Sequence, residues 1–510
     1  MVCRTTKYYR THPRARAKHR SYQAKYNKKP SQVRKRKALI KHNREHDKKY
    51  GKDSRRGKDA SHTKHGIVYK KSSVNRGSKS DMSGDRRARG KKRSTFFHAA
   101  GRGAAGSTAG WRFESARPDK FNENKKKMEI RFNVSEILPV LSQCATVVPR
   151  KTAIPILKSF QVAVRYCGNS GVKAFVTASD GEVWLTRKAV LTGGSDDWFD
   201  FCIDAFKLTK ALSSLKEGEV RMVLDSRTMS ATCEYDRGSF SMPYEAKDEY
   251  PLPKDEETEQ NSQIISGQSV LRSIKRVEYA ALHEDTIMPV LKGVYFDMNG
   301  DRMAVVATDT QMLAMACDPT TKSGGSYGFI LPNKAASVLK NVLPSVGKDV
   351  KVSHMGKSVQ FSNADFLLVA RTIDGKYPNY ERIIPKECGI VVCVNGSDFR
   401  NALKRVLPMT DEIYGYVILD FVPESGSVVL RGENAMFGKS ASETVGCTYM
   451  KAGTPTSIAF TGKNLLSSVS HLECDDEIFF EINGEASPAV IYSTDKDAEL
   501  SLLVPKRIVR

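Results

Sequence analysis

Several signatures that mark a compartment or a bound metal are missing from this sequence. Its ten cysteines form no Cys-x-x-Cys pair and no regular framework, and the closest two within residues 128–510 are Cys388 and Cys393. That spacing argues against a zinc site and against a secreted disulfide scaffold, so we interpret the thiols as reduced and mostly buried. No stretch approaches the ~20 apolar residues of a membrane span, and the N-terminus lacks the apolar region of a secretory signal. We therefore expect a soluble protein of the cytoplasm.

Catalytic signatures are missing as well. Residues 128–510 contain no P-loop, no GxSxG, no HExxH and no His/Cys set with metal-ligand spacing. Asp180 and Asp309 stand in two similar turns, but paired catalytic carboxylates would have to converge on one site. We therefore expect these aspartates to cap the two turns. We predict no catalytic residue, no cofactor and no metal.

Positive charge is concentrated at the start of the chain. Residues 1–127 hold 40 Lys and Arg against 9 Asp and Glu, a net of +31, whereas the other 383 residues hold 42 and 48, a net of −6. This leader has too few branched apolar residues to offset the entropy of ordering, so we expect it to be largely disordered. Its charge density favours nucleic-acid binding through phosphates, with stacking on bases by Tyr8, Tyr9, Tyr22 and Tyr26. A tail that serves only solubility or targeting is the alternative.

The leader raises two further questions. Its stretch KKPSQVRKRKALIKHNREHDKKYGKD resembles small basic proteins of phage genomes, which would make the gene viral or phage-derived. His62 and His65, with Asp59 nearby, suggest a nuclease or metal site, although three polar residues in a tail without further ligands are the simpler interpretation. Met128 directly precedes the first expected strand. It is therefore a candidate start of a free-standing protein, with the leader a fusion or a misassigned start.

A repeated unit organises residues 128–510. A polar or small residue opens an amphipathic helix of about three turns, and apolar strands follow. Six copies of this unit predict three similar domains of two units each, bounded at 128–254, 262–386 and 388–510. The helical copies begin at Val134, Asp204, Gln268, Pro332, Ser397 and Gly462.

The order of several motifs resembles the bacterial DNA sliding clamp, the beta subunit of the replicative DNA polymerase. The first domain carries KTAIPILKSFQVAV and VTASDGEVWLTRKA. The second carries MPVLKGVYFDMNGDRMAVVATDTQMLAMA and ARTIDGKYPNYERIIP. The third carries FRNALKRVLPMTDE, MFGKSASETV and the terminal LSLLVPKRIVR. The resemblance covers the whole of residues 128–510 in order.

This resemblance implies an α+β fold of three domains, each a pair of β-α-β-β-β units, with helices inside and sheets outside a head-to-tail dimer ring. Helical periodicity agrees, because Phe399, Ala402, Leu403 and Val406 fall on one face of the helix from Ser397. Arg400 and Lys404 fall opposite. In the helix from Gln268, Leu271 and Ile274 are expected inside and Arg272, Lys275 and Arg276 outside.

A ring that slides needs non-directional phosphate contacts, so its bore should carry Lys and Arg on the helices. Solvent-facing cations without a ligand are the alternative for any one of them. The first helix contributes Glu136 and no basic residue, and the sixth offers only Lys463 and His471. The candidate DNA-binding residues are Arg150, Lys151, Lys207, Lys210, Arg272, Lys275, Arg276, Lys334, Lys340, Arg400 and Lys404.

The resemblance also implies two protein interfaces. Ring closure would bring Phe240 and Met242 of the first domain against Leu407 and Met409 of the third, with ordinary core packing as the alternative. A groove between the second and third domains would capture short apolar peptides of the polymerase and the clamp loader. The positions that match that groove are Leu291, Thr308, Thr310, Met312, Leu313, Pro378, Arg382, Ile383, Pro488, Leu502, Leu503, Val504, Pro505, Lys506 and Arg507.

The groove departs from the family at two places. The family's Gly-His-Arg-Leu run reads Thr310-Gln311-Met312-Leu313, and its terminal Met-Pro-Met-Arg-Leu reads Val504-Pro505-Lys506-Arg507-Ile508. We therefore expect a changed peptide preference, as would suit a virus with its own polymerase.

Sequence-independent double-stranded DNA, a polymerase catalytic subunit, a clamp loader and a second copy of the chain are the expected partners of this non-catalytic processivity factor. Its compartment would be the bacterial cytoplasm, or that of a bacterial host. Two alternatives keep the basic leader in the main role. In one the leader is a degenerate nuclease module on a scaffold, and in the other the chain is a genome-packaging protein with a clamp-derived body.

Overall fold

The computed structural model describes Lys48, four strands of the leader, and residues 127–508 with short gaps. The gaps are 167–170, 196–197, 216, 254–260, 284–287, 301, 322–324, 412–414, 473–475 and 494. The chain divides into two compact units, Met1–Ser94 and Thr95–Arg510.

Strands within the leader form two hairpins that the sequence analysis did not predict. β1 (Lys58–Thr63) pairs antiparallel with β2 (Gly66–Lys71), and β3 (Phe96–Ala99) pairs with β4 (Trp111–Glu114). The backbone of Asp59 and His62 belongs to β1, while His65 lies outside the described residues. The four tyrosines proposed to stack on bases also lie outside them.

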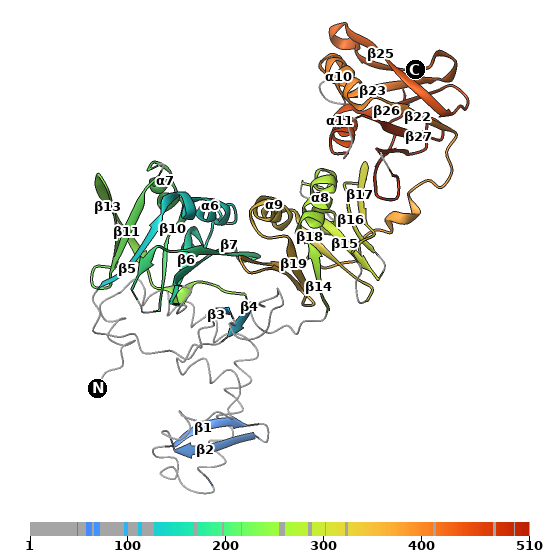
Figure 1. Cartoon of the computed structure of the whole chain (residues 1–510). Coiled ribbons are helices and arrows are strands. Elements are labelled where there is room, and N and C mark those ends of the chain that lie inside the picture. The colour runs from blue at the N-terminus through green and yellow to red at the C-terminus, as the bar shows by residue number, and fades with distance from the viewer. Residues whose placement is uncertain are drawn as a thin grey trace. The chain divides into compact units, whose positions relative to one another are not determined.

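The rest of the chain is built from six β-α-β-β-β units, as the repeat predicted (Figure 1). The first pair comprises β5 (Lys127–Asn133), α6 (Val134–Ala145), β6 (Ser159–Tyr166), β7 (Val172–Ser179), β8 (Val183–Val190), β10 (Phe199–Asp204), α7 (Ala205–Ser213), β11 (Glu219–Asp225), β12 (Ser230–Tyr235) and β13 (Gly238–Glu245), with the short β9 (Gly193–Gly194) after β8. The second comprises β14 (Asn261–Ser266), α8 (Gly267–Val277), β15 (Gly293–Asn299), β16 (Arg302–Thr308), β17 (Met312–Asp318), β18 (Tyr327–Pro332), α9 (Asn333–Val342), β19 (Asp349–His354), β20 (Ser358–Ser362) and β21 (Phe366–Arg371). The third comprises β22 (Ile390–Val394), α10 (Gly396–Val406), β23 (Tyr416–Val422), β24 (Ser427–Asn434), β25 (Lys439–Lys451), β26 (Thr456–Thr461), α11 (Gly462–Ser470), β27 (Ile478–Ile482), β28 (Ala489–Tyr492) and β29 (Glu499–Leu503).

Within each pair of units, the first strand of one unit adds to the sheet of the other. β5 pairs with β11 and β10 with β6. In the second pair β14 joins β19 and β18 joins β15, and in the third β22 joins β27 and β26 joins β23. This exchange makes each pair of units one domain. The fold class is therefore confirmed, while the residue numbers of the domain boundaries stay predictions.

Main-chain hydrogen bonding also joins the domains to one another. β8 of the first domain pairs with β21 of the second, with Leu185 opposite Leu368. β17 of the second pairs with β29 of the third, with Leu313 opposite Leu502. The result is a 13-stranded and a 12-stranded sheet that each cross a domain border.

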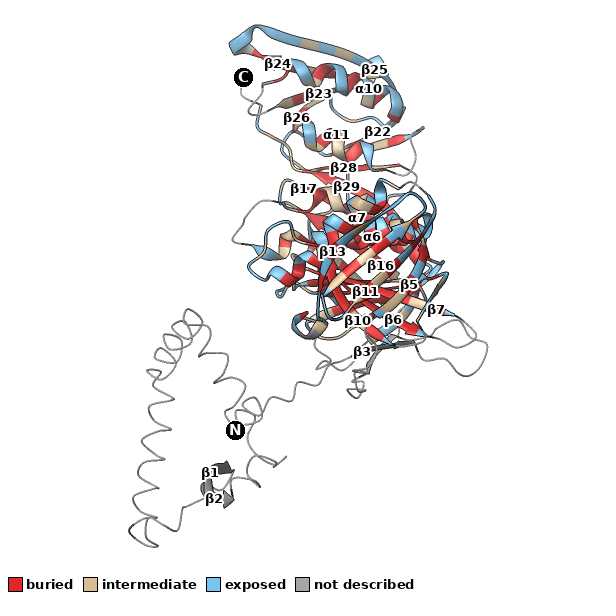
Figure 2. Ribbon diagram, turned by 90° about the vertical axis from the view of Figure 1, so that its left-hand side faces the viewer, coloured by how far each residue is buried: buried red, intermediate tan, exposed pale blue. Residues whose placement is uncertain are grey.

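The apolar periodicity of the helices points into the core as predicted. On α10, Phe399, Ala402, Leu403 and Val406 are all buried, and Asn395 caps the helix by accepting a hydrogen bond from the Asp398 amide. Figure 2 shows buried residues concentrated in the strands under the helices, whereas β25 is exposed along most of its length. Cys144, Cys202 and Cys233 are free and buried, as expected, but Cys317, Cys388, Cys393 and Cys447 are free and only partly buried.

Side chains fasten the domain borders. At the first border, Gln143 of α6 donates to the Asn341 carbonyl within α9 at 3.2 Å. It also donates to the hydroxyl of Ser345, which lies just after α9, at 2.8 Å. At the second border, the Tyr279 ring stacks on the His471 ring with centroids 4.4 Å apart, and its hydroxyl contacts Ser501. Helices α7, α6, α9 and α8 thus pack in succession, and α11 with α10 follow across the Tyr279 contact. We call these six helices the helix layer.

Candidate functional site

The helix layer carries most of the cations that the sequence analysis proposed for DNA. Eight of them are exposed, and the Lys207 side chain is 76% exposed, with an i,i+3 ion pair to Asp204. Exposed ammonium and guanidinium groups can exchange phosphates without fixed geometry. The exposed residues are Arg150, Lys151, Lys207, Lys210, Arg272, Lys275, Lys334 and Lys404.

Arg276 does not belong to this set. Its side chain is 11% exposed, and its Nε lies 3.0 Å from the carboxylate of Glu499, which is 2% exposed. The outward orientation predicted for Arg276 is wrong because Glu499 of β29 draws the guanidinium into the border between the second and third domains. A guanidinium that is buried and paired in this way does not face a phosphate backbone outside the protein.

Three of the candidates, the exposed Lys334 and the half-buried Lys340 and Arg400, contact other groups of the protein. Lys334 donates to the Val147 carbonyl at 2.9 Å and pairs with Asp180 at 2.5 Å, across the first domain border. Lys340 pairs with Glu278, and Arg400 donates to the Val469 carbonyl of α11 at 3.1 Å. These side chains are accessible, but each already contacts a carboxylate or a carbonyl of the protein. Their contacts therefore hold the helices and the first domain border together, and we assign them a smaller share in binding phosphates.

Charge is unevenly distributed on the helices, as the sequence suggested. Glu136 is exposed on α6, and that helix has no basic residue in its last turn. On α11, Lys463 is exposed, whereas His471 is held by the Tyr279 stack and by an Nδ1 contact of 2.8 Å to the Ser467 carbonyl.

The predicted groove is built on the pairing of β17 with β29. Leu313 and Leu502 face one another across the two strands and are 1% and 2% exposed. They pack with Tyr377, Tyr380 and the half-buried Val504 in an apolar cluster separate from the main core. Burial raises the pKa of both tyrosine hydroxyls.

The alternating direction of side chains along β17 and β29 removes two residues from the predicted groove. Met312 and Leu503 pair with one another, and both side chains belong to the main core rather than to the outer cluster. Since neighbouring residues of a strand point to opposite faces, these two face the core while Leu313 and Leu502 do not. Their assignment to the groove was wrong for that reason.

The other groove residues vary in exposure. Leu291 and Thr308 are buried, and the Thr308 hydroxyl donates to the Met312 carbonyl at 2.6 Å. Pro378, Pro488, Val504, Pro505 and Lys506 are half-buried, whereas Thr310, Arg382, Ile383 and Arg507 are exposed.

Two of the departures from the family meet in the structure. Thr310 has a φ of +78°, a conformation that favours the glycine of the family pattern. Next to it, the Gln311 side chain contacts the Lys506 ammonium, and the Gln311 carbonyl accepts from the Val504 amide at 2.9 Å. The substituted residues therefore tie the second domain to the chain's last described segment.

A cavity that the sequence did not predict lies beside this groove. It has a volume of about 390 Å³ and contains none of the predicted groove residues. Its lining comes from β16, β17, the segment after β21, and the turn before β29 together with the start of β29. These segments lie far apart in sequence and are brought together by the fold. The lining residues are Arg302, Met315, Tyr380, Glu381, Ile384, Pro385, Lys386, Lys496, Asp497 and Leu500.

The four residues proposed for ring closure also differ in how deeply their side chains are buried. Met242 is 9% exposed and belongs to the core, so the core alternative holds for its side chain. Phe240 and Leu407 are partly buried against the core, and Met409 is 38% exposed. Met242 is therefore removed from the candidate interface.

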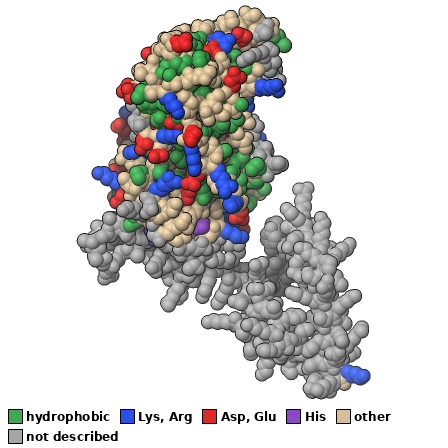
Figure 3. Space-filling view, turned by 90° about the vertical axis from the view of Figure 1, so that its right-hand side faces the viewer, with side chains coloured by type: hydrophobic (Ala, Val, Ile, Leu, Met, Phe, Trp, Pro, Cys, Tyr) green, Lys and Arg blue, Asp and Glu red, His purple; other side chains and the backbone are tan. Residues whose placement is uncertain are grey.

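Asp180 and Asp309 cap turns, as predicted. Asp180 Oδ1 accepts from the amides of Glu182 and Val183 at 2.9 and 2.8 Å, and Asp309 Oδ1 accepts from those of Gln311 and Met312 at 2.8 Å each. Within residues 127–508, gaps aside, no group of three or more His, Cys, Asp or Glu could hold a metal ion. Among the described helices, none is long and apolar enough to cross a membrane. On the face drawn in Figure 3, acidic and basic side chains are intermixed with apolar ones.

Comparison with known proteins gives a consistent result. Residues 264–379 match the family model of the DNA polymerase III beta subunit, central domain, and residues 381–507 match that of its C-terminal domain. A beta sliding clamp of Halalkalibacterium halodurans is 25% identical over 370 residues, which are 71% of this chain and 94% of that protein. That of Pseudomonas aeruginosa is 24% identical over 373 residues, or 73% and 98%.

Solved structures show the same fold. The sliding clamp of Pseudomonas aeruginosa bound to griselimycin superposes with a TM-score of 0.68 at 22% identity and covers 75% of this chain and all of that one. The DNA polymerase III beta subunit of Thermotoga maritima gives a TM-score of 0.67 at 21% identity with the same coverage.

Proposed function

The chain belongs to the bacterial-type DNA sliding clamps, and from this premise we propose that it forms a ring around duplex DNA and tethers a replicative polymerase to its template. The observation that carries the proposal is the helix layer, which runs through all three domains and exposes six of the candidate Lys and Arg side chains, while Arg150 and Lys151 are exposed in the segment after α6. A surface of this kind holds phosphates by charge alone, so the protein can move along DNA without reading its sequence.

Two unpaired strand edges support a closed ring. Residues Gly238–Pro243 of β13 pair only with β12, and residues Lys439–Gly446 of β25 pair only with β24, among the described residues. An open edge of this length invites pairing with another chain. We infer that β13 of one protomer pairs with β25 of the next, with Phe240, Leu407 and Met409 beside the joint, in a head-to-tail dimer.

The outer apolar cluster supports capture of partner peptides. Its floor is formed by the buried Leu313 and Leu502, and the half-buried Val504 and Pro378 with the exposed Ile383 lie at its margin. We infer that polymerase and clamp loader insert short apolar side chains there. The role is non-catalytic, and any chemistry would belong to the bound enzymes. The leader-driven alternatives are not favoured by the family matches.

Topological retention tests this function. The protein is incubated with nicked circular plasmid at high concentration and passed through a sizing column at roughly 0.5 M salt, which weakens every phosphate contact including those of the leader. A ring should stay with the circle and leave it when a restriction enzyme linearises the DNA. Equal retention on circular and linear DNA, or none on either after native mass measurement shows a closed oligomer, would overturn the proposal.

A further inference from the structure

The cavity beside the groove has a continuous apolar floor. Met315 and Leu500 pair across β17 and β29, two residues along from the pair Leu313 and Leu502. Residues two apart on a strand share a face, and all four side chains belong to the same apolar cluster. The floor of the cavity therefore extends the floor of the candidate groove.

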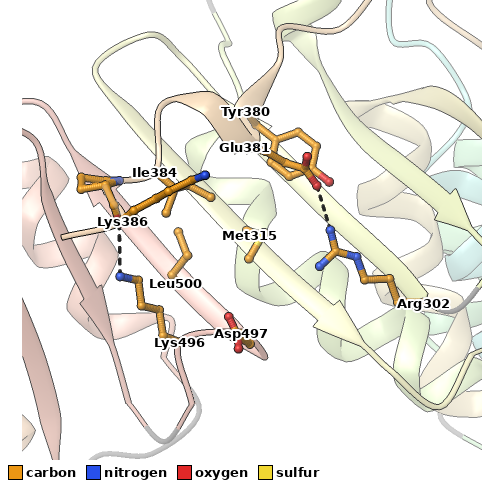
Figure 4. Close-up of a pocket in the computed structure, with 10 residues that line it drawn as sticks. Arg302, Met315, Tyr380, Glu381, Ile384, Lys386, Lys496, Asp497 and Leu500 are labelled. Carbon is orange, nitrogen blue, oxygen red and sulfur yellow. Dashed lines mark hydrogen bonds and ion pairs between the residues drawn. The ribbon is translucent and has the colours of Figure 1, made fainter.

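Charged side chains stand around this floor. In Figure 4, Lys386 and Lys496 lie on one side of Met315 and Leu500, and Glu381 with Arg302 lies on the other. Arg302 is paired with Glu381 at 2.9 Å, and Lys496 is paired with Glu481. In the part of the chain that the structure describes, the exposed Lys386 and Asp497 have no such ion pair.

We propose that this cavity is a second subsite for partner peptides, and that it takes an apolar side chain followed by an acidic one. The apolar side chain lies on Met315 and Leu500, and the carboxylate pairs with the Lys386 ammonium. Asp497 at the opposite rim accepts a peptide N–H and repels a second acid. A volume of about 390 Å³ suits such a fragment.

The inference rests on the proposed function, since it assumes that partner peptides reach the groove. Its chemistry is nevertheless distinct. The groove captures apolar side chains, whereas the cavity adds a requirement for one negative charge. Partners that carry the acid would bind more tightly than those that lack it, which would rank competing partners on one clamp.

The test uses the full chain labelled with carbon-13 at its methionine methyl groups. The probes are the capped dipeptides acetyl-Leu-Asp-amide and acetyl-Leu-Asn-amide, for which dissociation constants on the order of 1 mM are expected. Both should shift the Met315 signal saturably, and the Asp peptide should bind about fivefold more tightly, as for one exposed ion pair.

Lys386→Gln should abolish the preference for Asp over Asn while leaving the Asn peptide unaffected. Lys158→Gln, an exposed lysine of the first domain, should keep the full preference. The inference is overturned if Met315 shows no saturable shift, if only other methionines respond, or if the Lys386 variant still prefers Asp. None of these results bears on topological retention, so the two proposals fail separately.

Discussion

The guanidinium of Arg276 on α8 and the carboxylate of Glu499 on β29 form an ion pair of 3.0 Å that links the second domain to the third. Its neighbour Lys275 is exposed on the same helix. One position along the chain thus separates a cation paired across a domain border from one that is exposed to solvent.

Matched substitutions should separate these two roles. Arg276→Gln is expected to lower the free energy of unfolding by about 3–5 kcal/mol, because it removes the ion-pair partner of the buried Glu499 carboxylate. Lys275→Gln should leave stability unchanged, weaken DNA binding and reduce the slope of log affinity against log salt by about 1. Denaturant unfolding and DNA titrations across salt concentrations measure both. A large loss of stability in the Lys275 variant would contradict the assignment.

The two methionines proposed for ring closure should also behave differently. Met409→Lys is expected to shift the assembly toward the monomer with little effect on unfolding, since that side chain is 38% exposed. Met242→Ala should cost about 2–5 kcal/mol because it opens a cavity in the core. Analytical ultracentrifugation and denaturant unfolding report the two effects. If Met409→Lys leaves the oligomer intact at every concentration, Met409 is not at the joint.

The loss of folding stability at low pH should arise in part from Glu129 on β5. Hydrogen bonds from Arg221 and then Arg131 outweigh burial and lower the pKa of Glu129 from 4.5 to about 2. A carboxyl group whose pKa is lower in the folded state stabilises the fold above its unfolded pKa and loses that contribution as pH falls from about 4.5 toward 2. Glu129→Gln should make the unfolding midpoint less dependent on pH over this window. Glu217→Gln, at an exposed site in the same domain, should leave that pH dependence unchanged.

The strained backbone at Thr310 gives a prediction of opposite sign. A β-branched residue is disfavoured at a φ of +78°, so Thr310→Gly should raise the free energy of unfolding by about 1 kcal/mol. Thr310→Ala should recover less, since alanine retains a Cβ. Thermal unfolding of the three proteins ranks them. A destabilised glycine variant would mean that the threonine side chain contributes contacts that outweigh its strain.

Much of the fold was predictable because its determinants are local and repeated. The apolar spacing of Phe399, Ala402, Leu403 and Val406 identified a helix face, and six such faces gave the domain count. The capping roles of Asp180 and Asp309 followed from their turns. Packing across domain borders was not predictable in the same way. Nothing in the order of the residues shows that Arg276 meets Glu499, more than two hundred positions away.

The site was predictable to a lesser extent for a related reason. Family motifs located the strands of the groove, but the motif treats neighbouring residues alike, whereas a strand sends Met312 and Leu313 to opposite faces. The cavity at Met315 and Leu500 could not be found from the sequence, because its walls come from four separate segments. Taking account of the alternation of side chains along the two paired strands would have separated core residues from groove residues on the sequence alone.

The pairing of β8 with β21 and of β17 with β29 has a consequence for how far such a chain can diverge. Each of these joints is made by amide and carbonyl groups that every residue except proline supplies in full, so it places few demands on side-chain identity. Substitutions can accumulate along both strands while the angle between adjoining domains is inherited unchanged. Related proteins can therefore differ in most of their surface residues, and so in their binding partners, while their domains keep the same arrangement.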